Sequence, residues 1–235
     1  MAIDLDLNGW IDGITASGVV VFGIVIGVFF FYKSRKRKAK LLAYLGMANL
    51  FAGLMFLGVF LDFLFVLIVQ QNIVNNGTVA LISYIWFAPV IISAMYIGAE
   101  LLTPKIKKPI FIIFLILSII FEVIIFIDPI NSFKFNPAIP LPPDNLIDYN
   151  VNLLSLAGIL MGGLLLLVLV FLGLGFLYKA FQSSGVIRKN FFLLSAGSIS
   201  FCIFGLLEGL IAPGPLVIFV RLGYVSSFIL MYYGL

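Results

Sequence analysis

The chain has 235 residues, of which 63% are hydrophobic and only 10% are charged, and its mean hydropathy is +1.24. These values exclude a water-soluble globular domain and indicate a protein that lies in a lipid bilayer. It has no histidine and a single cysteine, Cys202, which excludes zinc sites, haem ligation by imidazole and histidine-activated nucleophiles. We therefore expect no enzyme activity, no metal site and no cofactor.

Seven apolar runs are each long enough to cross the bilayer, which takes about 20 helical residues for roughly 30 Å of hydrocarbon. The runs are apolar all round and do not alternate with polar residues, which favours helices over the strands of a barrel. The predicted spans are residues 10–32, 41–69, 79–102, 110–127, 151–178, 191–211 and 216–235. The predicted fold is an all-α integral membrane protein, a single domain built as a seven-transmembrane-helix bundle.

Twelve of the fourteen Lys and Arg residues fall in three segments that follow the first, third and fifth spans, namely 33–40, 105–108 and 179–189. The positive-inside rule places all three in the cytoplasm, so the N-terminus is expected outside and the C-terminus inside, in a multi-pass plasma-membrane protein. The clusters also predict contacts with anionic membrane lipids and leave room for a cytoplasmic signalling partner. We expect no binding to nucleic acid.

Two predicted exterior loops carry further signals. Residues 70–78 contain the sequon Asn76-Gly77-Thr78, which makes Asn76 a candidate glycosylation site. Residues 128–149 form a long segment, expected to be irregular or extended and a candidate cap for the bundle. This segment holds five prolines, Pro129, Pro137, Pro140, Pro142 and Pro143.

Four ionisable residues lie well inside the predicted spans, Asp62, Glu122, Glu208 and Arg221. Asp12 is counted with the acidic N-terminal tail, and Glu100 is close enough to Lys105 to reach the inner surface. A lone charge in hydrocarbon costs several kcal/mol and usually faces an interior cavity or a partner. From the helical rise of 1.5 Å per residue, all four lie in the outer half of the membrane, and Glu208 and Arg221 each lie roughly 10 Å from the turn that joins their spans. A Glu208–Arg221 ion pair is therefore geometrically available, although depth alone does not establish that the two side chains face each other.

This cluster has two interpretations. In the first, it only fixes helix packing, with Arg221 neutralised by Glu208 or Asp62. In the second, it lines an outward-facing pocket that binds a polar or cationic ligand or senses protons. Tyr84 and Trp86 could line the mouth of that pocket, although the aromatic belt at the membrane interface would also explain them.

Matching segments suggest an internal duplication. Tyr32-Lys33 closes the first span and Tyr178-Lys179 closes the fifth, and Met-Tyr-Ile-Gly at 95–98 corresponds to Met-Tyr-Tyr-Gly at 231–234. These matches predict a 3+1+3 arrangement of helices. Glycine pairs at four-residue spacing in the first and fifth spans indicate close helix packing, within the bundle or in a homodimer.

Seven spans with an exterior N-terminus are also the architecture of rhodopsins and of G-protein-coupled receptors. Their motifs are absent here, because the seventh span has no lysine for a retinal Schiff base and the chain has neither Asp-Arg-Tyr after the third span nor Asn-Pro-x-x-Tyr in the seventh. The likeness to these families is architectural only.

The end of the chain carries a closer resemblance in Leu-Leu-Ser-Ala-Gly at 193–197, Gly-Leu-Leu-Glu at 205–208 and Arg-Leu-Gly at 221–223. These segments resemble the seven-helix sensor regions that precede histidine kinases in archaeal and bacterial membranes. The resemblance implies a non-retinal, receptor-like sensor that signals through helix rearrangement. Because no kinase follows Leu235, we expect either a separate cytoplasmic output partner or a longer parent chain.

A small-solute transporter or channel is the alternative, because SWEET-type sugar carriers are also small 3+1+3 bundles. Those carriers use prolines within the spans of each repeat as hinges. Here Pro89 is the only clear proline inside a span, and the seventh span has none at the matching place. We therefore rank the sensor above the transporter.

Overall fold

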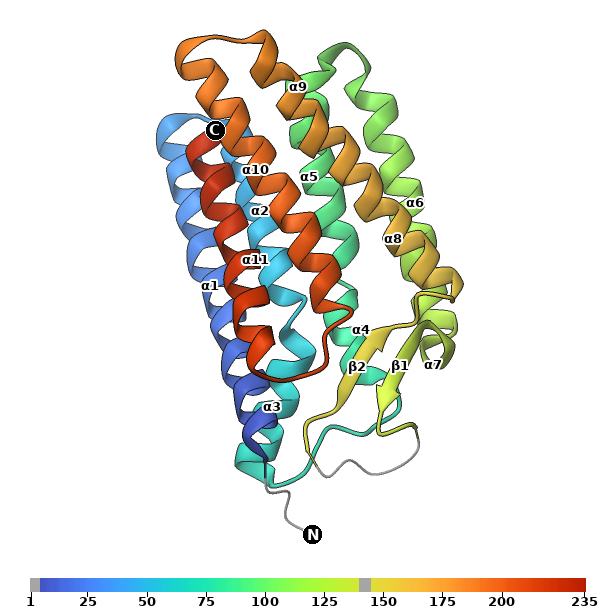
Figure 1. The fold of residues 1–235 in the computed structure, drawn as a ribbon. Helices are drawn as coiled ribbons and strands as arrows, with labels where there is room; N and C mark the ends of the chain where they lie inside the picture. Colours follow the sequence, from blue (N-terminus) through green and yellow to red (C-terminus); the bar gives the residue numbers. More distant parts are fainter. Residues whose placement is uncertain (1–4, 140–144) are drawn as a thin grey trace.

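The computed structural model describes residues 5–139 and 145–235, which form long helices and one small hairpin (Figure 1). The helices are α1 (Leu7–Arg37), α2 (Lys40–Leu54), α3 (Leu57–Val69), α4 (Thr78–Tyr84), α5 (Phe87–Leu102), α6 (Lys107–Ile127), α7 (Pro129–Ser132), α8 (Leu156–Val168), α9 (Gly175–Gln182), α10 (Gly185–Glu208) and α11 (Pro215–Gly234). A 3-10 turn, η1 (Pro104–Ile106), precedes α6, and a π-helical segment, η2 (Leu169–Leu174), joins α8 to α9.

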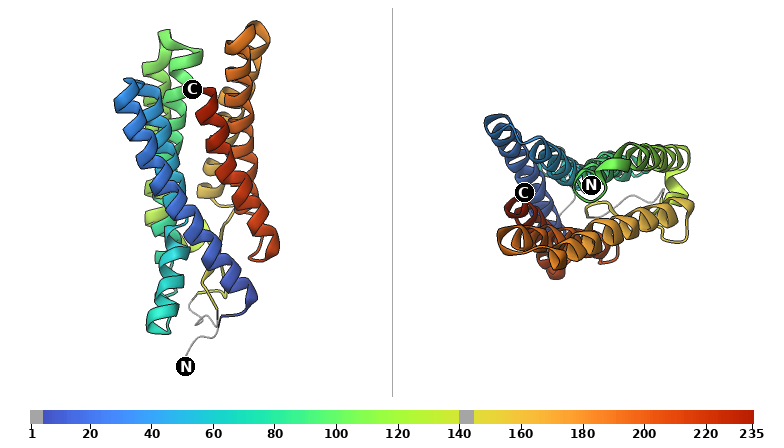
Figure 2. Two further views of the ribbon diagram at one scale, coloured as in Figure 1. Left: turned by 90° about the vertical axis from the view of Figure 1, so that its left-hand side faces the viewer. Right: turned by 90° about the horizontal axis from the view of Figure 1, so that it is seen from above.

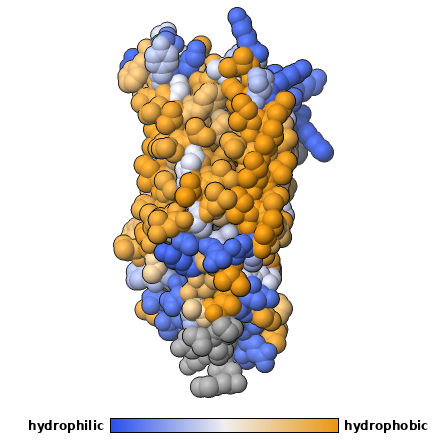
Figure 3. All heavy atoms as spheres, turned by 90° about the vertical axis from the view of Figure 1, so that its right-hand side faces the viewer, coloured by the Kyte–Doolittle hydropathy of each residue, from blue (hydrophilic) through white to orange (hydrophobic). Residues whose placement is uncertain are grey.

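The helices are those of an integral membrane bundle. Among the described residues, six helical stretches are long and apolar enough to cross a membrane, and α2 with α3 makes a seventh if this pair, bent by 43°, is one span. On the face shown in Figure 3, apolar side chains form a broad band around the middle, with polar residues at both ends. The predicted all-α membrane fold is confirmed at this level.

The spans form two layers. In the first, α1, α2, α5 and α6 lie side by side; in the second, α10 lies between α11 and the α8–η2–α9 stretch (Figure 2). The layers meet where α1 packs on α11 and where α6 packs on α8. The first four predicted spans thus lie in one layer and the last three in the other, and the 3+1+3 repeat stays a prediction.

Glycine brings α1 and α2 into close contact. A Cβ added to Gly23 would lie 2.7 Å from the Cα of Gly53, so neither position has room for a side chain. Asn49 donates a hydrogen bond of 3.1 Å to the carbonyl of Gly23 across the same contact. The glycine spacing predicted in the first span therefore serves packing inside the chain.

Two predicted spans are broken. Between α4 and α5 the helix is interrupted at Ile85 and Trp86, because the ring of Pro89 conflicts with the carbonyl of residue 85 and offers no N–H. Between α2 and α3 the N–H of Gly58 donates to the hydroxyl of Ser83 at 2.9 Å instead of continuing the helical ladder. The distribution of apolar residues alone predicts neither break.

The predicted exterior segment contains a hairpin. Strands β1 (Phe133–Asn136) and β2 (Asp148–Val151) pair antiparallel, with Phe133 opposite Val151 and Asn136 opposite Asp148. The fifth span was predicted to begin at residue 151, but Val151 ends β2 and the helix begins at Leu156. Ser155 caps that helix by accepting a hydrogen bond of 3.0 Å from the N–H of Gly158. Pro140, Pro142 and Pro143 lie outside the described residues.

The two ends of the bundle differ in charge and in structure. The three basic segments, 33–40, 105–108 and 179–189, all lie at one end, where α11 also finishes (Figure 1). The hairpin, the start of α1 and the 70–77 loop lie at the other. We refer to these as the basic end and the hairpin end.

Candidate functional site

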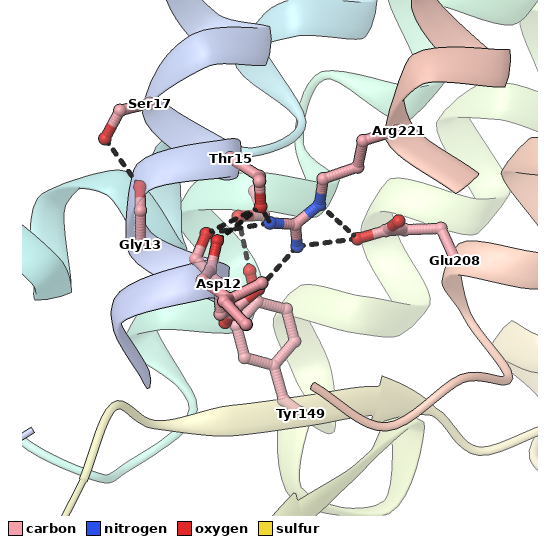
Figure 4. Close-up of polar contacts among 9 residues, drawn as sticks. Asp12, Gly13, Thr15, Ser17, Tyr149, Glu208 and Arg221 are labelled. Carbon is pink, nitrogen blue, oxygen red and sulfur yellow. Dashed lines mark hydrogen bonds and ion pairs between the residues drawn. The ribbon is translucent and has the colours of Figure 1, made fainter. Parts of the chain in front are cut away.

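Arg221, only 5% exposed, is held by side chains from both layers near the hairpin end (Figure 4). Its Nε and Nη2 donate to Oε1 of Glu208 at 3.0 and 2.8 Å. Its Nη2 also donates to Oδ1 of Asp12 at 2.6 Å. Its Nη1 donates to the main-chain oxygen of Asp12 at 2.8 Å and to the hydroxyl of Thr15. The Glu208–Arg221 ion pair that the sequence made available is present and joins α10 to α11, and the contacts with Asp12 and Thr15 join α1 to them.

Asp12 is the member of this cluster that sequence reasoning missed. Its carboxylate was grouped with the acidic N-terminal tail, although it falls inside the predicted first span. In the structure α1 begins earlier than predicted, because Asp6 caps it by accepting a hydrogen bond of 2.7 Å from the N–H of Gly9. Asp12 is thereby carried into the buried part of the helix, where it is 5% exposed. Its place inside an apolar run was the signal that could have found it.

The guanidinium group of Arg221 has no donor left over. Its five N–H groups match the five hydrogen bonds to Asp12, Thr15 and Glu208. Its carbon also lies 5.0 Å from the centre of the Phe56 ring. The acceptors are less fully used, because Oε2 of Glu208 is buried and has no hydrogen-bond partner among the described residues.

A cavity of about 80 Å³ lies beside this cluster, between the layers and next to the hairpin. That volume has room for several water molecules or a small ligand. Its charged lining residues are Asp12, Asp148, Glu208 and Arg221. Its aromatic lining residues are Phe56, Tyr84, Phe87, Tyr149, Phe201 and Tyr224. Three carboxyl groups thus face one cation in a cavity whose remaining lining is aromatic and aliphatic.

Asp148 brings the hairpin into the cavity wall. The pKa of its carboxyl group is raised to about 6, chiefly by burial and also by the nearby charge of Asp12, whereas hydrogen bonds from Asn136 and from the main chain of Tyr149 oppose the rise. The next residue anchors the strand, because the hydroxyl of Tyr149 donates to that of Ser83 at 2.6 Å. The hairpin is therefore fixed to the first layer at the cavity.

Asp62 does not line the cavity, contrary to expectation. Its side chain is fully buried and accepts three hydrogen bonds, from Asn72 at 2.9 Å, from the N–H of Ile73 at 2.8 Å and from the N–H of Ile147 at 2.9 Å. Asp62 lies in α3, beyond the bend, where it faces the loops. It ties the 70–77 loop to the segment that leads into β2.

Glu122 and Trp86 also lie outside the lining of this cavity, which corrects both predictions. Glu122 lies near the main chain of Ala88 at the start of α5, and both its oxygens are shielded from solvent without a hydrogen bond of regular geometry to the described residues. Trp86 stacks on Phe51 of α2, with 5.8 Å between ring centres. Of the aromatic pair expected at the pocket mouth, only Tyr84 lines the cavity. The apolar pattern gave depth in the membrane but not the direction of these side chains.

Two other predicted positions lie apart from the cavity. Asn76 is exposed at the hairpin end, where its side-chain oxygen accepts hydrogen bonds from the N–H of Thr78 at 3.1 Å and from its hydroxyl at 2.6 Å. Cys202 is buried, and its thiol lies 3.6 Å from the carbonyl of Leu165. In the part of the chain that the structure describes, no three His, Cys, Asp or Glu side chains come together so as to hold a metal ion.

Two further cavities continue between the layers toward the basic end. An apolar cavity of about 20 Å³ shares Phe201 with the cavity at Arg221. It also shares Leu194 and Leu235 with a cavity of about 510 Å³ at the basic end. The three cavities therefore follow one another along the bundle.

Comparison of the chain with protein-family models, with curated proteins and with solved structures gave no match. The resemblance to kinase sensor regions accordingly stays a prediction from sequence, and the function has to be argued from the site itself.

Proposed function

We propose that this protein is a receptor-like membrane sensor that binds a small organic cation in the cavity beside Arg221. The observation behind this proposal is that the hydrogen-bond donors of the cluster are all engaged, whereas one carboxylate acceptor is not. Every N–H of Arg221 is engaged, whereas Oε2 of Glu208 is buried without a partner among the described residues. A buried acceptor without a donor is costly, and a ligand that donates hydrogen bonds or carries positive charge would satisfy it.

The balance of charge favours the same class of ligand. Asp12, Glu208 and Asp148 face a single cation, Arg221, so the ionised lining is negative. An anion would meet this excess of carboxylates and find no free guanidinium donor. The aromatic walls suit a cation as well, because ammonium groups are attracted to the faces of tyrosine and phenylalanine rings.

In our proposal the hairpin end faces the exterior of a plasma membrane and the basic end faces the cytoplasm, as the positive-inside rule predicts. Asp12, Glu208 and Arg221 join three helices that each run toward the basic end. Ligand binding at Glu208 would alter the contacts among α1, α10 and α11, and a change in their packing would reach a separate cytoplasmic partner. The ligand thereby acts by favouring one arrangement of these helices.

Transport is the second candidate, and the row of three cavities between the layers favours it. A solute bound beside Arg221 would have to pass the apolar middle cavity, of only about 20 Å³, to reach the basic end. Such a path requires the layers to separate near Phe201, which lines both cavities. The sensor proposal does not require a solute to pass through the bundle.

The test of the binding proposal is a thermal-shift titration of the purified protein with choline and with its neutral carbon analogue, dimethylbutanol. We expect choline to raise the melting temperature in a saturable manner and the neutral analogue to have no comparable effect. Asp148→Asn should weaken the choline response several-fold, while Asp128→Asn, which removes a charge at the hairpin end outside the cavity lining, should leave it unchanged. Equal responses to both compounds would refute the proposal.

Flux measurements separate the two candidates. In vesicles reconstituted with the protein, the sensor predicts choline binding without uptake above that of protein-free vesicles. Saturable uptake that Asp148→Asn reduces in parallel with binding would replace the sensor with the transporter.

A further inference from the structure

We propose that the cavity of about 510 Å³ at the basic end is a second ligand site, which binds a phosphate group. It lies between the two layers, and α1, α2, α5, α10 and α11 contribute to it. Its polar lining residues are Arg37, Lys40, Tyr96, Glu100, Asn190 and Tyr232. This inference is independent of the site beside Arg221, because it rests on other residues at the opposite end of the bundle.

Two cations, Arg37 and Lys40, line this cavity. Arg37 ends α1 and Lys40 begins α2, and the turn between them is held by a hydrogen bond of 2.9 Å from the hydroxyl of Ser34 to the carbonyl of Ala39. The turn places both cations in the same wall. Neither forms an ion pair with any described carboxylate.

The position of Lys40 is set by aromatic rings. Its Nζ lies 5.4 Å from the centre of the Tyr96 ring and 6.0 Å from that of Tyr44, and the two rings stack 3.8 Å apart. Cation–π attraction of this kind holds the ammonium group at the cavity. A preplaced cation loses less side-chain entropy when a ligand binds.

The one acidic side chain in the lining, Glu100, attracts Lys40 electrostatically but forms its ion pair with another lysine. The carboxylate of Glu100 forms an ion pair of 2.7 Å with Lys107, which is not part of the lining. Arg37 and Lys40 therefore give the cavity a surplus of positive charge. An anion is the ligand that this surplus favours.

Neutral hydrogen-bond donors also line the cavity. The hydroxyl of Tyr232 accepts a hydrogen bond of 2.6 Å from Nζ of Lys33, which leaves its own proton to be donated. The hydroxyl of Tyr96 and the side-chain amide of Asn190 also belong to the lining. A phosphate group has several oxygens and can accept hydrogen bonds from such a set of donors and from two cations together.

The rest of the lining is apolar and includes Leu41, Leu42, Leu101 and Leu194. The ligand is therefore a phosphate group attached to an apolar or neutral remainder. Two sources share that chemistry, the headgroup of an anionic phospholipid and a soluble phosphate ester. The basic end lies where lipid headgroups meet the bundle, so both can reach it.

The test counts bound lipid by native mass spectrometry of the full chain in neutral detergent, with short-chain phosphatidylglycerol as the probe. Arg37→Gln/Lys40→Gln should weaken the tightest binding event at least about tenfold, a loss equivalent to about 1.4 kcal/mol. The matched control is Arg35→Gln/Lys36→Gln, which removes the same two charges from neighbouring exposed positions outside the lining. This control should bind like the unaltered protein.

Equal weakening in both double variants would overturn the proposal in favour of diffuse attraction by surface charge. No weakening in either variant would overturn it as well. Lys40→Arg, which keeps the charge, should retain binding and shows that a loss is not caused by misfolding. Competition with glycerol phosphate identifies the source of the phosphate. Displacement of the lipid at similar concentrations indicates a soluble ester, and failure to displace it indicates a lipid headgroup.

Discussion

Nη2 of Arg221 lies 2.6 Å from Oδ1 of Asp12, a residue 209 positions earlier in the chain. This ion pair joins the first helix to the last and closes one edge of the two layers. Both residues are buried, at 5% exposed each. The pair therefore combines a structural role with a place in the wall of the proposed ligand cavity.

Arg221→Met is predicted to destabilise the protein by about 3–5 kcal/mol, because it leaves Asp12 and Glu208 buried without a countercharge. The triple variant Asp12→Asn/Glu208→Gln/Arg221→Met removes all three charges and should lose less stability than the single variant. Reversible unfolding in mixed detergent micelles measures both. A triple variant no more stable than Arg221→Met would contradict the assignment of this cluster as a charge-balanced unit.

Asp62→Ala should loosen the hairpin end, including Ile147 in the wall of the cavity beside Arg221. It removes the acceptor of two main-chain hydrogen bonds, from Ile73 and Ile147, and each lost bond costs about 1–3 kcal/mol when the donor stays buried. Hydrogen exchange at these two amides should accelerate, while exchange in the middle of α10 stays unchanged. Uniform acceleration throughout the chain would indicate general unfolding instead.

Replacement of Glu122, unlike that of Asp62, is not expected to destabilise the protein. Its carboxylate oxygens are shielded and have no countercharge among the described residues, so Glu122→Gln should be neutral or stabilising by up to about 1 kcal/mol. Glu208→Gln is the matched comparison, because it removes a partner of Arg221 and should destabilise. Thermal unfolding of the two variants provides the comparison, and a large loss at Glu122 would reveal a partner for this carboxylate.

Asp148 should give the protein a pH-dependent stability. Its pKa is raised from 3.8 to about 6 in the folded state, so the native carboxyl group holds its proton more tightly than the unfolded chain does. The stabilisation is fully present below pH 3.8 and is lost as the pH rises through about 6. The melting temperature should therefore fall over this range, and Asp148→Asn should remove that part of the decline.

The same titration bears on the proposed ligand. Ionised Asp148 attracts a cation and protonated Asp148 does not, so choline should bind more tightly at pH 7.5 than at pH 5, values chosen roughly to bracket the raised pKa near 6. Asp148→Asn should make the affinity nearly independent of pH in this interval. Tighter binding at the lower pH would contradict a role for this carboxylate.

The sequence allowed the membrane fold and one side-chain pair to be predicted, for identifiable reasons. The length of an apolar run determines that it can span the bilayer. The short connection between the sixth and seventh predicted spans determines that Glu208 and Arg221 lie at a similar depth. Depth does not determine direction around a helix, which is why Asp62 and Glu122 were wrongly grouped with that pair.

The remaining features depend on contacts distant in sequence. Asp12 reaches Arg221 only because the two layers close at α1 and α11. Likewise, the bend near Gly58 follows from a hydrogen bond to Ser83 in another helix, which no local pattern encodes. Pro89 is the exception, since a proline inside an apolar run does signal the break before α5.

The hydroxyl of Ser83 accepts hydrogen bonds from both Tyr149 of the hairpin and the N–H of Gly58. One oxygen thus fastens the hairpin and the bent second span at a common point. Loss of this one hydroxyl would therefore remove the anchor of the hairpin and the partner of the bend together. The cavity wall at Tyr149 and the shape of the second span thus depend on the same side chain.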